Sequence, residues 1–158
     1  ILMIKSNIAI FASLLLFAFS CQGKNVENKM IMKCLIQPTG IISETYLIQI
    51  FENGLFDITY GIKSSGFEKD DFDTIVNKQS IMLKESDLKT IMGLQSQILK
   101  LKEVEKTVTK KGGWEIFLMT AEKKYHFYYG EQKDTSLGEL IEILKQISPI
   151  KIDTHSWS

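Results

Sequence analysis

The sequence predicts an α+β fold: an antiparallel β-sheet of four to six strands with two helices packed on one face, after an N-terminal signal segment. Three observations support this prediction. Two β-rich segments are each interrupted by a short turn, and two other segments repeat apolar residues at helical spacing. The chain has 158 residues, of which 44% are hydrophobic and 24% charged, a composition typical of globular proteins. This length favours one domain, expected over residues 30–158.

The first predicted hairpin covers residues 45–60. Asn53 and Gly54 lie between two β-rich runs, and both accept the positive φ that a two-residue turn requires. With these two as the turn, Phe51 lies opposite Phe56. Three residues are then expected on the core side of the hairpin: Phe51, Phe56 and Ile58.

The segments around this hairpin give a strand, a loop, a strand and a helix. Residues 30–37 alternate as a strand does, and Pro38 follows them. Residues 61–73 are polar and are expected to form a loop, with another strand at 74–83. A helix should then begin at Ser86, whose hydroxyl is a suitable N-cap.

The second predicted hairpin covers residues 114–129 and turns near Glu122 and Lys123. Both of its faces carry apolar residues, so either the hairpin is covered on both sides or one face is left for a partner. The face assigned as a possible interface consists of Phe117, Met119, His126 and Tyr128.

The last predicted helix has a clear beginning and end. Ser136 followed three residues later by Glu139 is a capping box, and Ser148 and Pro149 end the apolar stripe that follows. The tail over residues 150–158, which contains Trp157, is expected to pack back as a strand or a flap.

The first twenty residues have the three parts of a secretory signal. Lys5 precedes an uncharged run over residues 8–19, which Ser20 and Cys21 follow. Twelve helical residues extend roughly 18 Å, too short for a hydrocarbon core of roughly 30 Å. We therefore expect a signal peptide at residues 1–20 and a flexible polar tether at 21–29.

Cys21 at the end of this run resembles the lipobox of bacterial lipoproteins, a resemblance that covers only the first 21 residues. Ser20 fits the small residue that precedes the lipobox Cys, whereas Ala18 and Phe19 depart from the usual Leu and Ala or Ser. The resemblance implies lipidation of Cys21, anchoring to an envelope membrane and a domain facing the periplasm or the cell surface. Gln22 after the Cys resembles the sorting signal of outer-membrane lipoproteins.

Two other outcomes remain open for this segment. A plain small-x-small cleavage site would leave Cys21 unmodified and able to pair with Cys34, and an uncleaved segment would act as a weak anchor. All three outcomes involve export. With Cys21 lipidated, Cys34 is the other Cys of the sequence and is expected to be a small buried hydrophobe.

The composition argues against several classes of function. Nineteen basic residues, all Lys, balance nineteen acidic ones, so the chain has neither Arg forks nor a positive field for nucleic acid. Asp70, Asp71 and Asp73 lack the spacing of a calcium loop, and two His give no zinc motif. Ser86 and Lys89 match the Ser-x-x-Lys of penicillin-binding proteins without the elements that accompany it. We expect no catalytic residues, metal or cofactor.

Two functional hypotheses follow. The first is a non-catalytic envelope protein that binds another protein through the apolar face of the second hairpin, unless the tail covers that face. The second is a small-molecule or glycan-binding module, with a cleft between sheet and helices lined by aromatic residues. The candidates for such a cleft are Tyr60, Trp114, Tyr129 and Trp157.

Overall fold

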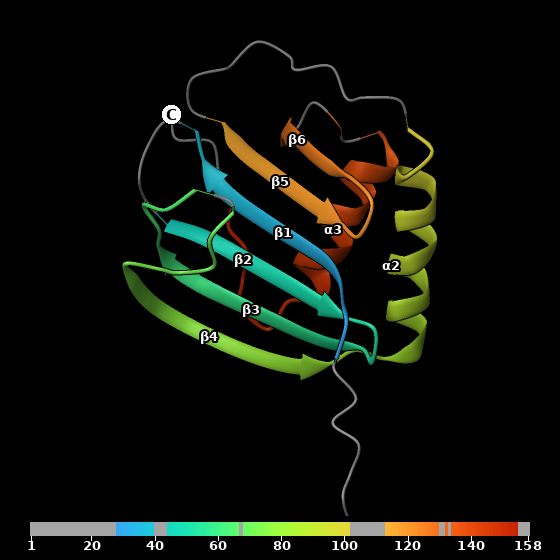
Figure 1. Cartoon of the computed structure of the whole chain (residues 1–158), viewed down its shortest axis with the longest axis horizontal. Coiled ribbons are helices and arrows are strands. Elements are labelled where there is room, and N and C mark those ends of the chain that lie inside the picture. Colours follow the sequence, from blue (N-terminus) through green and yellow to red (C-terminus); the bar gives the residue numbers. More distant parts are fainter. Residues whose placement is uncertain are drawn as a thin grey trace, which may run out of the picture.

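The computed structural model describes residues 28–39, 44–66, 68–101, 113–129, 132 and 134–154. In these parts of the chain it forms a six-stranded antiparallel sheet with two helices on one face, which confirms the predicted α+β fold (Figure 1). The predicted signal peptide (1–20) and Cys21 lie outside the described residues. The strands are β1 (Met30–Pro38), β2 (Glu44–Phe51), β3 (Leu55–Ile62), β4 (Thr74–Met82), β5 (Trp114–Thr120) and β6 (Lys124–Tyr128), and the helices are α2 (Glu85–Ile98) and α3 (Ser136–Ile147).

The strands lie in the order β4-β3-β2-β1-β5-β6. The first four strands are neighbours in the sheet in the same order as in the chain, so the chain reaches one edge of the sheet at β4. Helix α2 follows, and β5 then pairs with β1 in antiparallel register, with Cys34 opposite Leu118. β1 is therefore a central strand, between β2 and β5, and β6 forms the second edge.

The two-residue turn predicted at Asn53 and Gly54 is wrong by one residue. Ile50, not Phe51, lies opposite Phe56, because residues 52–54 form a three-residue loop. Gly54 closes this loop at φ +87°, the left-handed position that such loops assign to glycine. A shift of one residue moves side chains to the opposite face, so Phe51 leaves the predicted core face, while Phe56 and Ile58 are fully buried as expected.

The second hairpin turns one residue earlier than predicted, at Ala121 and Glu122. Thr120 favours this turn because its hydroxyl oxygen accepts hydrogen bonds from the backbone N–H groups of Glu122 and Lys123, at 3.3 and 3.1 Å. Phe117 consequently lies opposite His126. Each residue of β5 therefore lies opposite a β6 residue two positions earlier in the sequence than predicted. Because side chains alternate between the two faces of a strand, a shift of two residues leaves every side chain on its predicted face.

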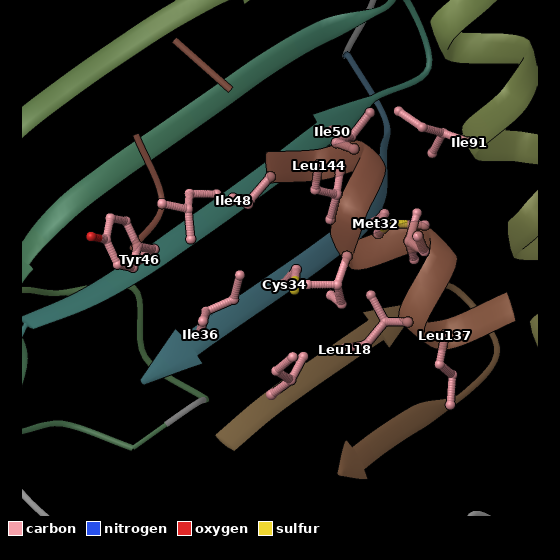
Figure 2. Close-up of a cluster of buried hydrophobic side chains, with 14 of the residues drawn as sticks. Met32, Cys34, Ile36, Tyr46, Ile48, Ile50, Ile91, Leu118, Leu137 and Leu144 are labelled. Atoms are coloured by element: carbon pink, nitrogen blue, oxygen red, sulfur yellow. The ribbon is translucent and has the colours of Figure 1, made fainter. Parts of the chain in front are cut away.

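The core lies between the helices and the face of the sheet that they cover, called here the inner face (Figure 2). Alternate residues of the strands point into it, and Ile91, Leu94 and Ile98 of α2 and Leu140 and Leu144 of α3 pack against them. Cys34 belongs to this core and is fully buried, as expected. The residues of the sheet that are completely buried there are Cys34, Ile36, Ile50, Phe56, Ile58, Ile116 and Leu118.

Both helices begin at residues other than the predicted caps. Lys84 precedes α2 without a side-chain cap, so Ser86 lies within the first turn. Thr135 caps α3, since its hydroxyl accepts from the backbone N–H of Gly138 at 3.5 Å. The end of α3 at Ser148 is as predicted.

Residues 150–154 pack back on the domain without forming a strand. Ile150 and Ile152 are buried, and the backbone N–H of Asp153 donates to the hydroxyl of Tyr46 at 3.3 Å. Trp157 lies outside the described residues.

Candidate protein-binding surface

The second hairpin presents its four predicted interface residues on one side. Phe117 and Met119 of β5 and His126 and Tyr128 of β6 point away from the helices, because their neighbours Leu118 and Phe127 point into the core. We call Phe117, Met119, His126 and Tyr128 the hairpin patch, and the side of the sheet on which it lies the outer face. All four side chains are half-buried.

Three rings of the hairpin patch form a continuous row. The rings of Phe117 and His126 stack with centroids 4.2 Å apart and planes 9° apart. Tyr128 lies beside His126 at 5.7 Å and an angle of 50°. Stacked and tilted ring pairs of this kind are favourable contacts, so the row is a connected, half-buried aromatic surface.

Polar groups surround this row. Glu115 accepts a hydrogen bond from the amide of Gln37 at 3.3 Å, and its other carboxylate oxygen lies 3.9 Å from Nε2 of His126. At this distance Nε2 makes no hydrogen bond, and the atom is buried. On the other side, Lys124 forms an ion pair with Glu68 at 2.6 Å. An apolar centre with a polar rim is the usual composition of a protein interface.

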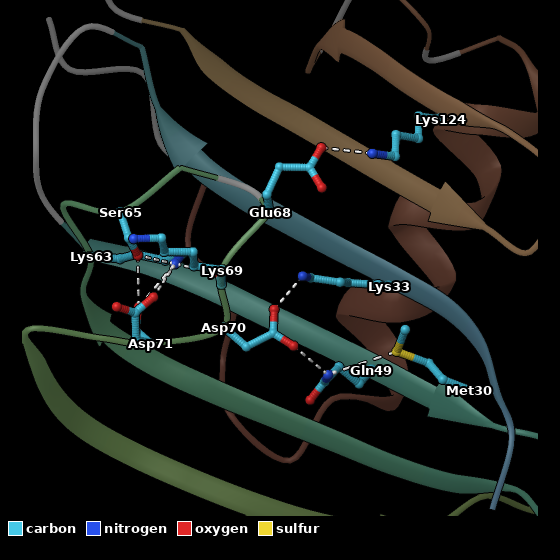
Figure 3. A network of polar contacts seen from close by, with 10 residues as sticks. All are labelled: Met30, Lys33, Gln49, Lys63, Ser65, Glu68, Lys69, Asp70, Asp71 and Lys124. Atoms are coloured by element: carbon cyan, nitrogen blue, oxygen red, sulfur yellow. Dashed lines mark hydrogen bonds and ion pairs between the residues drawn. The ribbon is translucent and has the colours of Figure 1, made fainter.

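Much of the remaining outer face is covered by the loop that joins β3 to β4 (Figure 3). Leu35 and Leu47, whose side chains point to the outer face, are 1% and 3% exposed. Asp70 of the loop pairs with the buried Lys33 of β1, and it also accepts from the amide of Gln49 at 3.1 Å. The loop thus covers the centre of the outer face and reaches the β5–β6 end through the ion pair of Glu68 with Lys124, where the hairpin patch is half-buried.

Lys63 holds this loop together from inside. Its side chain is completely buried, and its ammonium group donates to the carbonyl oxygens of Lys69 and Asp71 at 2.6 and 2.9 Å and to the hydroxyl of Ser65. Burial lowers the pKa of Lys63, whereas the nearby carboxylates of Asp71 and Asp70 raise it.

The acidic residues of the loop pair with lysines and backbone groups instead of converging on a cation. Hydrogen bonds to Ser65 and to its own backbone lower the pKa of Asp71. Asp73 accepts from the backbone N–H of Ser64 at 2.6 Å. Among the described residues no three His, Cys, Asp or Glu side chains are grouped as metal ligands.

The aromatic residues expected to line a ligand cleft do not form one group. Tyr60 stacks on Tyr46 at 4.7 Å, and Trp114, which is 4% exposed, lies 6.2 Å from the same ring. Tyr129 is engaged elsewhere, since its hydroxyl donates to Glu142 at 2.6 Å and accepts from Lys145 at 2.8 Å. Residues 150–154 pack beside Tyr46.

The exposed apolar edge on β4 was not predicted from the sequence. Ile75, Val76 and Met82 are 56%, 61% and 63% exposed. Their residue types indicated a strand, but nothing in the sequence showed that this strand would lie at an edge, where its side chains pack against few neighbours.

No helix in the described part of the chain is long and apolar enough to cross a membrane. Comparison with known proteins gives no match: no family model fits the chain, and no curated protein or solved structure is significantly similar to it.

Proposed function

We propose that the protein is a bacterial envelope lipoprotein, anchored through lipid on Cys21, whose folded domain is a non-catalytic protein-binding module. The anchor is supported by the signal-like segment before Cys21, and Gln22 favours the outer membrane, with the domain facing the periplasm or the surface. The single observation that carries the binding function is the half-buried row of contacting rings formed by Phe117, His126 and Tyr128 on the outer face.

The shape of the hairpin patch favours a protein over a small molecule. Small ligands bind in concave sites that enclose most of their surface, whereas the patch extends over two adjacent strands of a sheet. Its aromatic centre offers apolar contacts, and Glu115 and Lys124 at the rim offer polar contacts. Protein interfaces use both kinds of contact.

The binding function is tested by replacing both Phe117 and Tyr128 with Ser. Because these side chains are half-buried on the outer face, we expect the variant to fold, as judged by circular dichroism and thermal unfolding. A partner that co-purifies with the wild-type protein from crosslinked envelopes should be lost, and Met92→Ser, at an exposed site of α2, should retain it. Loss of folding, or an unchanged partner, would contradict the proposal.

The anchor has its own test in Cys21→Ala. The wild-type protein should sediment with membranes and show the mass of a chain cut before Cys21 and carrying acyl chains, while the variant should appear in the soluble periplasmic fraction. Wild-type protein with an unmodified Cys21 would contradict this part of the proposal.

A further inference from the structure

A row of apolar and aromatic side chains crosses the outer face and continues the hairpin patch. Leu47 of β2 lies opposite Leu35 of β1, and Leu35 lies opposite Phe117 of β5. Phe117 in turn lies opposite His126 of β6. Residues opposite each other in a sheet point to the same face, so the four side chains form one row. The two leucines are 1% and 3% exposed, whereas the hairpin end of the row is half-buried.

The buried end of this row lies beneath residues 68–73 of the loop between β3 and β4, called here the strap (Figure 3). Asp70 of the strap pairs with Lys33 of β1 and accepts a hydrogen bond from Gln49 of β2 at 3.1 Å. Lys33 and Gln49 are each two residues from one of the two leucines and point to the same face. The contacts of Asp70 therefore bring the strap over the leucines.

The strap is attached to the sheet face mainly through charged contacts. Five of its six residues are charged and exposed, and the sixth, Phe72, is half-buried. The ion pair of Glu68 with Lys124 is exposed on both sides, and water screens such pairs. Lys33 is 4% exposed, so desolvation offsets much of its attraction to Asp70. Opening the strap returns this ammonium group to water, which lowers the free energy needed to open it.

Other contacts order the strap from its β3 end. The ammonium group of Lys63, directly after β3, donates to the carbonyl oxygens of Lys69 and Asp71 at 2.6 and 2.9 Å. These bonds do not join the strap to β1, β2 or β6. The strap can therefore leave the sheet face as an ordered unit while it stays attached beside β3.

We propose that the strap is an autoinhibitory cover, which opens to uncover Leu35 and Leu47 as an extension of the hairpin patch. This inference rests on the binding function proposed for that patch. With the strap closed, a partner contacts only the half-buried end of the row. With the strap open, it contacts a row that crosses four strands. Because only the open state offers the whole row, the fraction of open molecules limits the apparent affinity.

Thiol labelling tests the opening without any partner. Leu35→Cys places a thiol beneath the strap, and Leu118→Cys is the matched control, because Leu118 is equally buried but lies in the core on the inner face. Both variants are made in the full chain, and tandem mass spectrometry separates each new thiol from Cys21 and Cys34.

We expect Leu35→Cys to be labelled at least about tenfold faster than Leu118→Cys, because the strap opens locally whereas the core thiol needs global unfolding. Low urea concentrations should leave the rate at Leu35→Cys unchanged and raise the rate at Leu118→Cys, since only global unfolding exposes a large surface. Equal rates with the same urea dependence would overturn the proposal.

Asp70→Asn connects opening to binding. It weakens the pairing of the buried Lys33 in the closed state, so labelling of Leu35→Cys should become at least about tenfold faster. Capture of the envelope partner by crosslinking should rise at least about threefold. Asp73→Asn is the matched control: Asp73 accepts from the backbone N–H of Ser64 at the β3 end, a bond that Asn can retain, so both readouts should stay close to wild type.

Two failures are distinguishable. Unchanged labelling in Asp70→Asn, or faster labelling without increased capture, would overturn the autoinhibitory role of the strap. No captured partner from either wild type or Asp70→Asn would refute the binding function of the hairpin patch, and this inference with it.

Discussion

Cys34 shows how strongly a single environment can determine a residue's chemistry. Its thiol lies in the core, opposite Ile48 on one side and Leu118 on the other, with no exposed surface. Burial raises the pKa of Cys34 from 9.0 to about 12. The sequence predicted this burial correctly, because Cys34 shares the alternation of its apolar neighbours in the strand.

The pKa of Cys34 makes stability depend on alkaline pH. The folded-state pKa lies above the unfolded value, so this contribution is complete below pH 9.0 and is lost as pH rises toward about 12. The free energy of unfolding of wild type should therefore decline relative to that of Cys34→Ala over this range, in urea titrations at successive pH values. Since buried tyrosines titrate in both proteins, the difference isolates Cys34. Parallel pH curves would contradict this expectation.

Gly61 is required by close packing where β3 meets β4. The ladder has an irregularity at Tyr60 and Gly61, and a Cβ on Gly61 would overlap the carbonyl oxygen of Thr74. Gly61→Ala should lower the free energy of unfolding by about 1–3 kcal/mol. Gly93→Ala is the control: a Cβ there meets nothing within 4 Å on α2, so helix propensity should raise stability by about 0.5–1 kcal/mol. Equal effects of the two changes in chemical denaturation would refute the packing argument.

At the scale of elements, the sequence predicted which segments form strands and helices better than where each one turns. Asn53 and Gly54 indicated a hairpin correctly, but the same pair suits both a two-residue turn and the three-residue loop that forms. The longer loop places Ile50 on the inner face, where it is fully buried with Phe56. Burial of the whole strand thus determined the register, which local turn preferences could not.

The loop between β3 and β4 was predicted only as polar, and its organisation depends on Lys63. Replacing Lys63 with Met removes the donor that joins Ser65, Lys69 and Asp71, so we expect a loss of about 1–3 kcal/mol and faster amide exchange in residues 63–73. The measurement is hydrogen exchange with mass spectrometry, combined with chemical denaturation.

Lys124→Met is the control for that experiment. Lys124 and Glu68 form an exposed pair, with side chains 58% and 74% exposed, and such pairs contribute little to stability because water screens them. Amide exchange in the loop should stay close to wild type. If Lys63→Met behaved like Lys124→Met, the buried ammonium group would not be what orders the loop.

At the scale of the whole molecule, the fold class followed from composition and periodicity, whereas the strand order did not. β1 pairs with β5 across a separation of about eighty residues, and no local signal in Cys34 or Leu118 announces that contact. The exposure of the hairpin patch likewise could not be predicted from local sequence. The sequence placed Phe117 and His126 on one face, but only the assembled sheet shows that Leu35 and Leu47 are buried beside them while the hairpin patch is half-buried.

The central claim is that the hairpin patch binds another envelope protein, and site-specific photo-crosslinking in intact cells tests it most directly. A photoreactive residue replaces Met119 in the patch or, as a control, the exposed Met92 on α2. We predict one dominant adduct with a different protein from position 119 and its absence from position 92. No adduct at 119, an adduct with a second copy of this chain, or the same adduct from both positions would contradict the claim.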